Sequence, residues 1–174
     1  RSWRKDHYAP YKRNRKEMAD AMTEKEKEEN EVFWECFDDF CDFIKTKTNV
    51  TVLRNARTEA DDLIARWIDK HPDQKHVIIS TDKDLNQLVA PNVKQYNGIT
   101  ETTLTHQGWF DKKGDPVIDK KSKAPKPAPD TEWIVFDKAM RGDPSDNIFS
   151  AYPGVRTKGT KNKIGLQEAF ADRK

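Results

Sequence analysis

In TEADDLIARWIDKHPDQKHVIIS, residues 58–80, a helix pattern leads directly into a strand pattern. Apolar side chains recur at helical spacing over residues 59–70, and HVIIS (76–80) is the kind of continuous apolar run found in buried parallel strands. VTVLR (50–54) is a further strand candidate. Strand, helix and strand in this order predict a right-handed βαβ unit. We therefore expect an α/β fold with a central, mainly parallel sheet flanked by helices.

Acidic residues gather where these elements begin and end. Glu59, Asp61 and Asp62 crowd the first turn of the expected helix, where favourable interaction with the helix dipole accounts for one or two of them. Asp82 and Asp84 directly follow the strand HVIIS. Because ligands of open α/β sheets bind outside the carboxyl ends of the strands, we expect these five acids to converge at that edge.

The motif GDPSDN (142–147) adds two carboxylates, Asp143 and Asp146. They stand near the end of the helix expected in TEWIVFDKAM (131–140), where cations are usually favoured. An N-cap role for the next segment would explain Asp146 alone. Like charges raise one another's pKa unless cations neutralise them, so seven carboxylates in three clusters predict bound cations.

The chemistry of these acids indicates the cation and the reaction. Carboxylate oxygens are hard ligands that select Mg²⁺ or Mn²⁺, and no His or Cys is placed to favour zinc. Two such ions about 3.5–4 Å apart suit an in-line displacement at phosphorus, because one activates water while the other stabilises the leaving oxygen. The expected cofactor is a pair of Mg²⁺ or Mn²⁺ ions, and the expected reaction is phosphodiester hydrolysis.

The first residues have a composition that suits nucleic acid. Residues 1–16 carry seven Lys or Arg against one Asp, interleaved with aromatic rings. Cations neutralise phosphates and aromatic faces stack on unpaired bases, although a solvated basic arm fits the composition equally well. Residues 17–31 are acidic and lack an apolar period, which predicts a solvated connector or an exposed helix.

An aromatic segment follows in VFWECFDDFCDFI (32–44). Its apolar side chains recur at three and four residues: Phe33, Phe37, Phe40 and Ile44. This spacing predicts a helix that buries a wide aromatic stripe in the core. Cys36 and Cys41 have neither a metal-site spacing nor a disulfide framework, so we expect two reduced core thiols.

The later part of the chain alternates and turns. Residues 93–119 have turn signals at Asn97-Gly98 and Lys113-Gly114, which predict short antiparallel strands. A loop rich in Pro and Lys is expected at residues 120–130.

The whole chain has 174 residues, 34% of them hydrophobic and 36% charged, with a net charge of +2. These values predict about one domain with a polar surface. No apolar run approaches the roughly 20 residues of a membrane span, and the first residues lack the apolar centre of a signal peptide. The expected setting is cytoplasmic, without a membrane partner.

Three motifs occur in an order that resembles a known group of enzymes. EADDLIA, ISTDKDLNQL and GDPSDN resemble the motifs of the 5′ nuclease superfamily of flap endonucleases and 5′-3′ exonucleases, with the closest likeness to phage exonucleases of the phage ribonuclease H type. SWRKDHYAPYKRNR looks like that family's basic segment leading into its helical arch. The resemblance implies a PIN-like α/β domain with a basic helical arch and the start of a helix-hairpin-helix DNA clamp.

The resemblance also implies a function. It implies a metal-dependent 5′ nuclease that hydrolyses phosphodiester bonds near 5′ ends, in flap, primer or exonucleolytic removal during phage replication. The implied partners are DNA or an RNA-DNA hybrid with a 5′ end or flap, and replication proteins, without a small-molecule cofactor. If the protein is phage-encoded, its setting is the cytoplasm of the host cell.

Residue roles carry over onto the matching motifs. Glu59, Asp61 and Asp62 would serve the first metal or its waters, and the second metal would be held by Asp82, Asp84, Asp143 and Asp146. The residues implied to be catalytic are Lys12, Asp61 and Asp84. The residues implied to contact nucleic acid are Tyr8, Tyr11, Lys12, Arg13, Arg15, Lys158, Lys161 and Lys163.

The sequence departs from the family pattern at both ends. The family begins with a strand that bears an early metal-binding Asp, followed by another Asp, and neither precedes Arg1, so we expect N-terminal strands to be missing. The Gly-rich segment within residues 148–174 has a longer spacing than the family's clamp. We expect a basic arm and acidic connector at 1–31, a nuclease core at 32–147 and the beginning of the clamp at 148–174.

These departures keep other interpretations open. One is a catalytically incomplete fragment that binds nucleic acid, and an activity assay distinguishes it. Another is a PIN-type ribonuclease, which lacks the basic arch and the clamp. Because unpaired strand edges invite association, we expect the 174-residue chain alone to self-associate and to cleave poorly.

Overall fold

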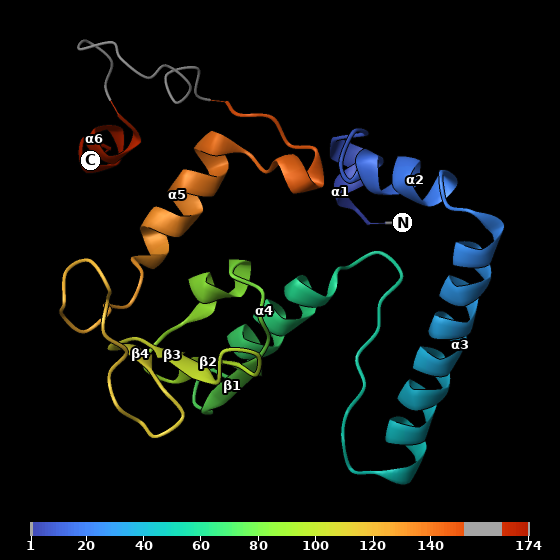
Figure 1. Cartoon of the computed structure of the whole chain (residues 1–174), viewed down its shortest axis with the longest axis horizontal. Helices are drawn as coiled ribbons and strands as arrows, with labels where there is room; N and C mark the ends of the chain where they lie inside the picture. Colours follow the sequence, from blue (N-terminus) through green and yellow to red (C-terminus); the bar gives the residue numbers. More distant parts are fainter. Residues whose placement is uncertain (1, 152–164, 174) are drawn as a thin grey trace. The chain divides into compact units, whose positions relative to one another are not determined.

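The structure is a computed structural model that describes residues 2–151 and 165–173. Figure 1 shows its helices and strands along the chain. Within the described residues, no helix combines the length and the apolar character that crossing a membrane requires. Expected roles at Lys158, Lys161 and Lys163 fall outside the described residues.

Contacts within the chain define two compact units. Unit 1 consists of residues 1–63 and 143–148, and unit 2 of residues 64–142 and 149–174. Helix α4 (Ala60–Lys70) confirms the helix expected at 59–70. The boundary between the two units falls inside this helix.

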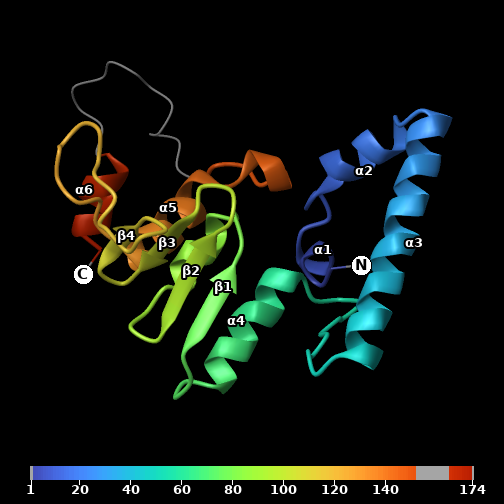
Figure 2. The same cartoon turned by 60° about the horizontal axis from the view of Figure 1, so that its bottom comes forward.

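A four-stranded sheet forms the centre of unit 2. Its strands are β1 (His76–Ile79), β2 (Val93–Asn97), β3 (Thr102–Thr105) and β4 (Gly108–Phe110), and they lie side by side in this order (Figure 2). β1 and β2 are parallel, whereas β2–β3 and β3–β4 are antiparallel. The α/β class is therefore confirmed with a mixed sheet, where a mainly parallel one was expected.

The core of unit 2 lies between the sheet and α4. Ile78, Leu85 and Val93 are buried together, and Ile64 and Ile68 of α4 pack against them. Positions four apart share one face of a helix, which explains why these two side chains meet the sheet together.

The remaining elements of unit 2 follow local signals. The short 3₁₀ helix η1 (Asp84–Leu88) lies between β1 and β2. Helix α5 (Thr131–Arg141) begins after Asp130, whose side chain accepts hydrogen bonds from the first-turn N–H groups, as an N-cap does. Helix α6 (Leu166–Ala171) packs on α5 through three aromatic rings: Trp133, Phe136 and Phe170.

The strand expected at residues 50–54 is not formed. These residues have no regular structure, so the βαβ unit expected around α4 is absent from the described chain and β1 lies at an edge of the sheet. Val50 and Leu53 are exposed, and Arg54 instead forms an ion pair with Asp38 at 2.8 Å. A short apolar run becomes a strand only where a neighbouring strand can pair with it, which is why the sequence pattern was misleading here.

Unit 1 contains three helices and a 3₁₀ turn. They are α1 (Arg4–His7), α2 (Arg13–Asp20), α3 (Glu24–Lys47) and η2 (Pro144–Asp146). Thr23 and Glu26 form a capping box that fixes the start of α3. The exposed helix expected within residues 17–31 is therefore confirmed.

The aromatic stripe of α3 is exposed, where a buried stripe was expected. Phe33, Phe37 and Phe40 are 59%, 40% and 59% exposed, respectively. Their spacing correctly predicted the helix, but periodicity does not say what covers an apolar face. Cys36 is exposed and Cys41 is half-buried, so both thiols are free as expected but neither lies in a core.

Candidate functional site

Tyr11 lies at the centre of a polar cluster in unit 1. Its side chain is only 5% exposed, and its hydroxyl oxygen is 3.1 Å from a carboxylate oxygen of Glu59 and 3.1 Å from one of Asp146. A hydroxyl has one proton, so it can donate to only one of these carboxylates at a time. The ring is buried in this structure, and the expected contact of Tyr11 with nucleic acid stays a prediction.

Lys12 joins the same two carboxylates. Its Nζ lies 2.5 Å from Glu59 Oε2 and 3.8 Å from Asp146 Oδ2. The backbone of Lys12 has φ 52°, a left-handed conformation that is uncommon outside glycine. Its N–H donates to the Asp146 carbonyl at 2.9 Å, so backbone and side chain together hold this conformation.

Two arginines complete the pairing of acids in unit 1. Arg15 Nη2 lies 2.7 Å from the second carboxylate oxygen of Asp146. Arg4 binds Asp62 through both guanidinium Nη atoms, at 2.6 and 2.7 Å. Such a two-point contact is among the stronger charge-assisted interactions. The acids were expected to need external cations, whereas Lys and Arg of the chain itself neutralise three of them.

The acidities of the cluster follow from this pairing. Burial disfavours the charged form of Glu59, but hydrogen bonds from Lys12 and Tyr11 outweigh it and lower its pKa. The hydrogen bond from Arg4 lowers the pKa of Asp62. Burial raises the pKa of Tyr11 to about 12, although Lys12 opposes the change.

The backbone of the arm is bonded to the turn around η2. Asn147 Nδ2 donates to the Pro10 carbonyl at 2.8 Å, and Asn14 Nδ2 donates to the Ser145 carbonyl at 3.0 Å. Asp143 caps η2, because its Oδ1 accepts from the Ser145 N–H at 2.9 Å. In the sequence a capping role offered an explanation for Asp146 alone, and in the structure Asp143 is the residue that caps η2.

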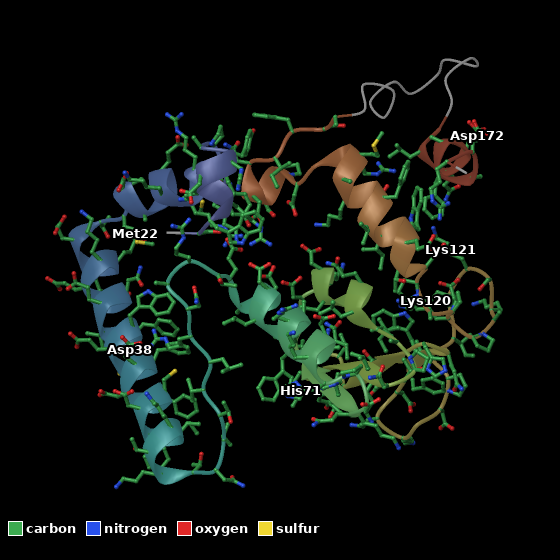
Figure 3. All side chains as sticks on the ribbon, turned by 180° about the vertical axis from the view of Figure 1, so that it is seen from behind. Met22, Asp38, His71, Lys120, Lys121 and Asp172 are labelled. Atoms are coloured by element: carbon green, nitrogen blue, oxygen red, sulfur yellow. The ribbon has the colours of Figure 1, made fainter. Side chains whose placement is uncertain are left out.

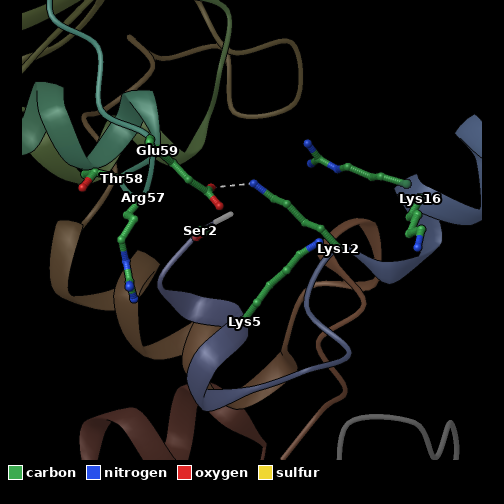
Figure 4. Close-up of a pocket in the computed structure, with 9 residues that line it drawn as sticks. Ser2, Lys5, Lys12, Lys16, Arg57, Thr58 and Glu59 are labelled. Atoms are coloured by element: carbon green, nitrogen blue, oxygen red, sulfur yellow. Dashed lines mark hydrogen bonds and ion pairs between the residues drawn. The ribbon is translucent and has the colours of Figure 1, made fainter.

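A cation-rich hollow of about 450 Å³ lies beside this cluster (Figure 4). It is lined by five cationic side chains and one carboxylate: Lys5, Lys12, Arg15, Lys16, Arg57 and Glu59. Figure 4 shows the Lys12 side chain extending to Glu59. The excess of positive charge suits an anion such as a phosphate group.

Asp82 and Asp84 lie in unit 2, directly after β1. Asp82 Oδ1 accepts from the Asp84 N–H at 2.8 Å, and Asp84 Oδ1 lies 3.0 Å from Lys138 Nζ of α5. Gln95, buried in β2, donates to the carbonyls of Ser80 and Asp82 at 3.0 and 2.7 Å. It therefore holds the backbone from which these acids project.

The carboxylates do not form a metal cage in the described residues. Among residues 2–151 and 165–173, no three His, Cys, Asp or Glu side chains are arranged to hold one ion. Asp61 Oδ1 instead accepts from the Asp62 N–H at 3.0 Å. The convergence of acids from both units stays a prediction.

The expected contacts with nucleic acid fall into two groups. Arg13 and Arg15 are exposed, with side chains 70% and 58% accessible, so their outer atoms can meet a ligand. Tyr8 is 36% exposed, and its hydroxyl donates to the Asn147 carbonyl at 3.3 Å. Tyr11 and Lys12 contact the carboxylates of Glu59 and Asp146 in this structure, and their contact with nucleic acid stays a prediction.

Sequence reasoning missed three residues that organise these acids. Arg4 was counted only as part of a basic arm, and Lys138 and Gln95 were not singled out. The signal for Gln95 was a polar residue two positions after Val93 on the inward face of a strand. For Arg4 and Lys138 no local signal exists, because their partners are 58 and 54 residues away.

Comparison with known proteins agrees with the motifs. Residues 1–114 match the family described as 5′-3′ exonuclease, N-terminal resolvase-like domain. The flap endonuclease Xni of Shewanella piezotolerans is 29% identical over 171 residues, which cover 97% of this chain and 55% of that protein. DNA polymerase I of Rhizobium leguminosarum is 29% identical over 126 residues, or 71% of this chain and 11% of that protein.

Solved structures from bacteriophage T5 share the fold. The T5 5′-exonuclease with bound zinc has a TM-score of 0.68 and 26% identity, covering 98% of this chain and 55% of that one. A T5 flap endonuclease in a pseudo-enzyme-product complex with DNA and metal ions has a TM-score of 0.67 and 27% identity, covering 89% and 52%.

These matches fix the fold class and the family. The chain spans about half the length of the Xni and T5 proteins. The likeness to the T5 structures and the mixed sheet with flanking helices confirm the PIN-like α/β class. The family match covers well over half of the 174 residues, so the chain belongs to the family of 5′-3′ exonuclease N-terminal, resolvase-like domains.

Proposed function

We propose that this protein is a metal-dependent 5′ nuclease that hydrolyses phosphodiester bonds near 5′ ends of DNA or RNA-DNA hybrids. The observation that carries the proposal is the cluster around Tyr11, which joins the basic arm to Glu59 and Asp146 of two separate acidic motifs. Family membership and the nuclease relatives give the reaction class. The cation-rich hollow next to Glu59 supplies the attraction for phosphate.

Substrate binding would use the exposed cations of the arm. Arg13, Arg15 and Lys16 present positive charge without reading base identity, because contacts to phosphates carry little sequence information. Recognition would therefore depend on a free 5′ end or flap. We propose DNA as the main partner and replication proteins as further partners. The proposed setting is the cytoplasm, which would be that of the infected host cell if the protein is phage-encoded.

Metal dependence is a separate part of the proposal. Its support is that T5 relatives were crystallised with metal ions, one of them with zinc, and that hard carboxylate oxygens suit Mg²⁺ or Mn²⁺. The proposed ligands are the seven motif acids: Glu59, Asp61, Asp62, Asp82, Asp84, Asp143 and Asp146. An ion at Glu59 or Asp146 would compete with Tyr11 and Lys12, which now contact one carboxylate oxygen of each acid.

A cleavage assay tests the proposal with the protein at its full natural length. A 5′-labelled flap substrate is incubated with Mg²⁺, with Mn²⁺ and with a chelator, and cleavage is expected only with a metal ion. Asp84→Asn and Asp143→Asn are each expected to abolish cleavage while keeping the fold. Asp84 lies at the surface, and Asp143 caps η2, a role that Asn also fills well. Asp69→Asn, an exposed acid paired with Arg66 on α4, is the matched control and should cut normally.

The outcome also decides between the alternatives. If the Asp84→Asn protein cut at the rate of the unaltered protein, the assignment would be wrong. A non-catalytic nucleic-acid-binding role is favoured by one observation, the pairing of Glu59, Asp62 and Asp146 with the chain's own cations. That role predicts binding of the flap substrate without metal-dependent cleavage. Cleavage of single-stranded RNA in preference to the flap would favour a PIN-type ribonuclease.

A further inference from the structure

A second hollow lies in unit 2, away from the acids that follow β1. Its volume is about 430 Å³, and it is lined by the first residues of β1 and β2 and by the turn between β3 and β4. β1 and β2 are parallel, so their first residues lie at the same end of the sheet. Asp82 and Asp84 follow the opposite end of β1, so this hollow is distinct from the candidate nuclease site.

Two lysines, Lys75 and Lys94, give the lining of the hollow a positive charge. The lining also includes His76 and His106, and no Asp or Glu. In the part of the chain that the structure describes, neither lysine has a carboxylate within ion-pairing distance, whereas Lys12 and Arg4 of unit 1 are paired. The charge of these two lysines is therefore available to a ligand.

The two lysines lie on the same side of the sheet. Val77 pairs with Lys94 across the parallel strands, and Lys75 precedes Val77 by two positions. Because side chains alternate along an extended chain, Lys75, Val77 and Lys94 share one face. His106 lies in the turn after β3 and is exposed. Three nitrogen-bearing side chains thus border one concave surface.

Hydrogen bonds hold the walls of this hollow in place. The His76 N–H donates to the Asn92 carbonyl at 2.8 Å, and Asn92 Nδ2 donates to the carbonyls of Pro72 and Gln74 at 2.9 and 3.0 Å. His76 Nε2 lies 2.9 Å from the His71 carbonyl, which can only accept, so His76 is engaged in the wall. Among the lysines and histidines of the lining, His106 and the two lysines remain as the groups that can meet a ligand.

We propose that this hollow binds a phosphate group through Lys75, Lys94 and His106. Lysine ammonium groups attract phosphate as point charges, and a hollow without carboxylates does not oppose the anion. The volume exceeds that of a bare phosphate and falls within the range of small-ligand pockets. It can hold either a nucleoside monophosphate or a short length of phosphodiester backbone, which share the same phosphate oxygens.

The test is an amide NMR titration of the full chain, with backbone signals of residues 75, 94 and 106 as reporters. Three probes are added separately: inorganic phosphate, a nucleoside 5′-monophosphate and a blunt DNA duplex without a flap. The pocket variant is Lys75→Gln with Lys94→Gln. The matched control is Lys120→Gln with Lys121→Gln, which removes the same charge from the loop labelled in Figure 3.

The expected result is that the pocket variant loses about tenfold in affinity for at least one probe, equivalent to about 1.4 kcal/mol. The control variant should lose less than about twofold, as expected for a general change in net charge. Shifts with the two small probes would identify a small phosphorylated ligand, and shifts with the duplex alone would identify polynucleotide backbone. Both outcomes support the proposal.

Two outcomes would overturn it. One is the absence of shifts at residues 75, 94 and 106 with all three probes. The other is an equal loss of affinity in the pocket and control variants, which would show only a net-charge effect. Amide spectra of both variants report whether the fold is kept. The flap assay is measured alongside, and because it depends on the acids and not on this hollow, the two proposals succeed or fail independently.

Discussion

The hydroxyl group of Tyr11 contacts carboxylates of two acidic motifs. This hydroxyl group can be removed without creating a large cavity. Tyr11→Phe keeps the buried ring and removes the hydroxyl that donates to either Glu59 or Asp146. We expect a loss of about 1–2 kcal/mol in the free energy of unfolding, because half-buried carboxylate oxygens lose a donor. Urea denaturation measures this change.

Tyr8→Phe is the matched control, since its longer hydrogen bond lies at the surface and its loss should be much smaller. A spectroscopic titration gives a second check. Burial raises the pKa of Tyr11 to about 12, so a tyrosine ionisation near this pH should be missing from the Tyr11→Phe spectrum. Equal destabilisation by both variants would contradict the central role of Tyr11.

The Arg4–Asp62 pair predicts a dependence of stability on pH. The hydrogen bond from Arg4 lowers the pKa of Asp62 in the folded protein below the pKa of the same carboxyl group in the unfolded chain. A lowered pKa contributes stability above the unfolded value, near 3.9, and this contribution is lost as pH falls through the folded value. Unfolding temperature should therefore fall as the solution is acidified below about pH 5.

Asp62→Asn should weaken this acid dependence, and Arg4→Met should weaken it to a similar extent. The double variant should add little to either, since both remove the same interaction. Thermal unfolding from pH 3 to pH 7 measures all four proteins. Additive effects of the two substitutions would show that the pair does not act as a unit.

At the scale of single elements, the exposed aromatic face of α3 predicts self-association. Contiguous exposed apolar patches favour association in water, and Phe33 and Phe40 are both 59% exposed. Replacing both by Ser should reduce self-association in sedimentation and change unfolding free energy by less than about 0.5 kcal/mol each, because exposed sites contribute little. Phe136→Ser is the contrasting control, since Phe136 packs against Trp133 and Phe170 and its loss should destabilise the fold.

If the Phe33 and Phe40 double variant unfolded as readily as the Phe136 variant, the face would be part of a core after all. An unchanged sedimentation profile would show that another surface drives association. Either result would require a different account of α3.

Elements were predicted well wherever a local signal decides them. Helices α4 and α5 and the strands β2 to β4 followed from periodicity and from turn residues such as Gly98, which lies between β2 and β3. The strand predicted at residues 50–54 was wrong, because β-branched residues favour a strand only when a partner strand is present. The burial of α3 was wrong because amphipathic spacing identifies a face but not its cover.

The candidate site was predictable in its parts and not in its pairings. Sequence order placed the acids in three motifs, and the motifs were enough to suggest the family. The ion pairs of Lys12 with Glu59 and of Arg4 with Asp62 join residues 47 and 58 positions apart. Contacts at that separation depend on the tertiary fold, so no local pattern predicts them.

At the scale of the whole molecule, the arm predicts salt-dependent binding of single-stranded 5′ ends. Replacing Lys12 and Arg15 together by Gln should weaken binding and reduce the log-log salt slope by about one unit for each lost phosphate contact. Fluorescence anisotropy at several salt concentrations measures the slope. The Lys120 and Lys121 double variant, with the same loss of charge, should leave the slope nearly unchanged. If the salt slope of the Lys12 and Arg15 double variant were unchanged, these residues would make no phosphate contacts and the arm would be a solvated surface.

The position of Lys12 between Glu59 and Asp146 also has a thermodynamic consequence. An anion that drew Lys12 away would leave both carboxylates without that cation, and a cation that took the carboxylate oxygens would release Lys12 toward an anion. Each ligand would thus remove the competitor of the other. Linkage requires that the gain be reciprocal, so each would strengthen the binding of the other by the same factor. The ion pair of Lys12 would then couple the binding of an anion to the binding of a cation.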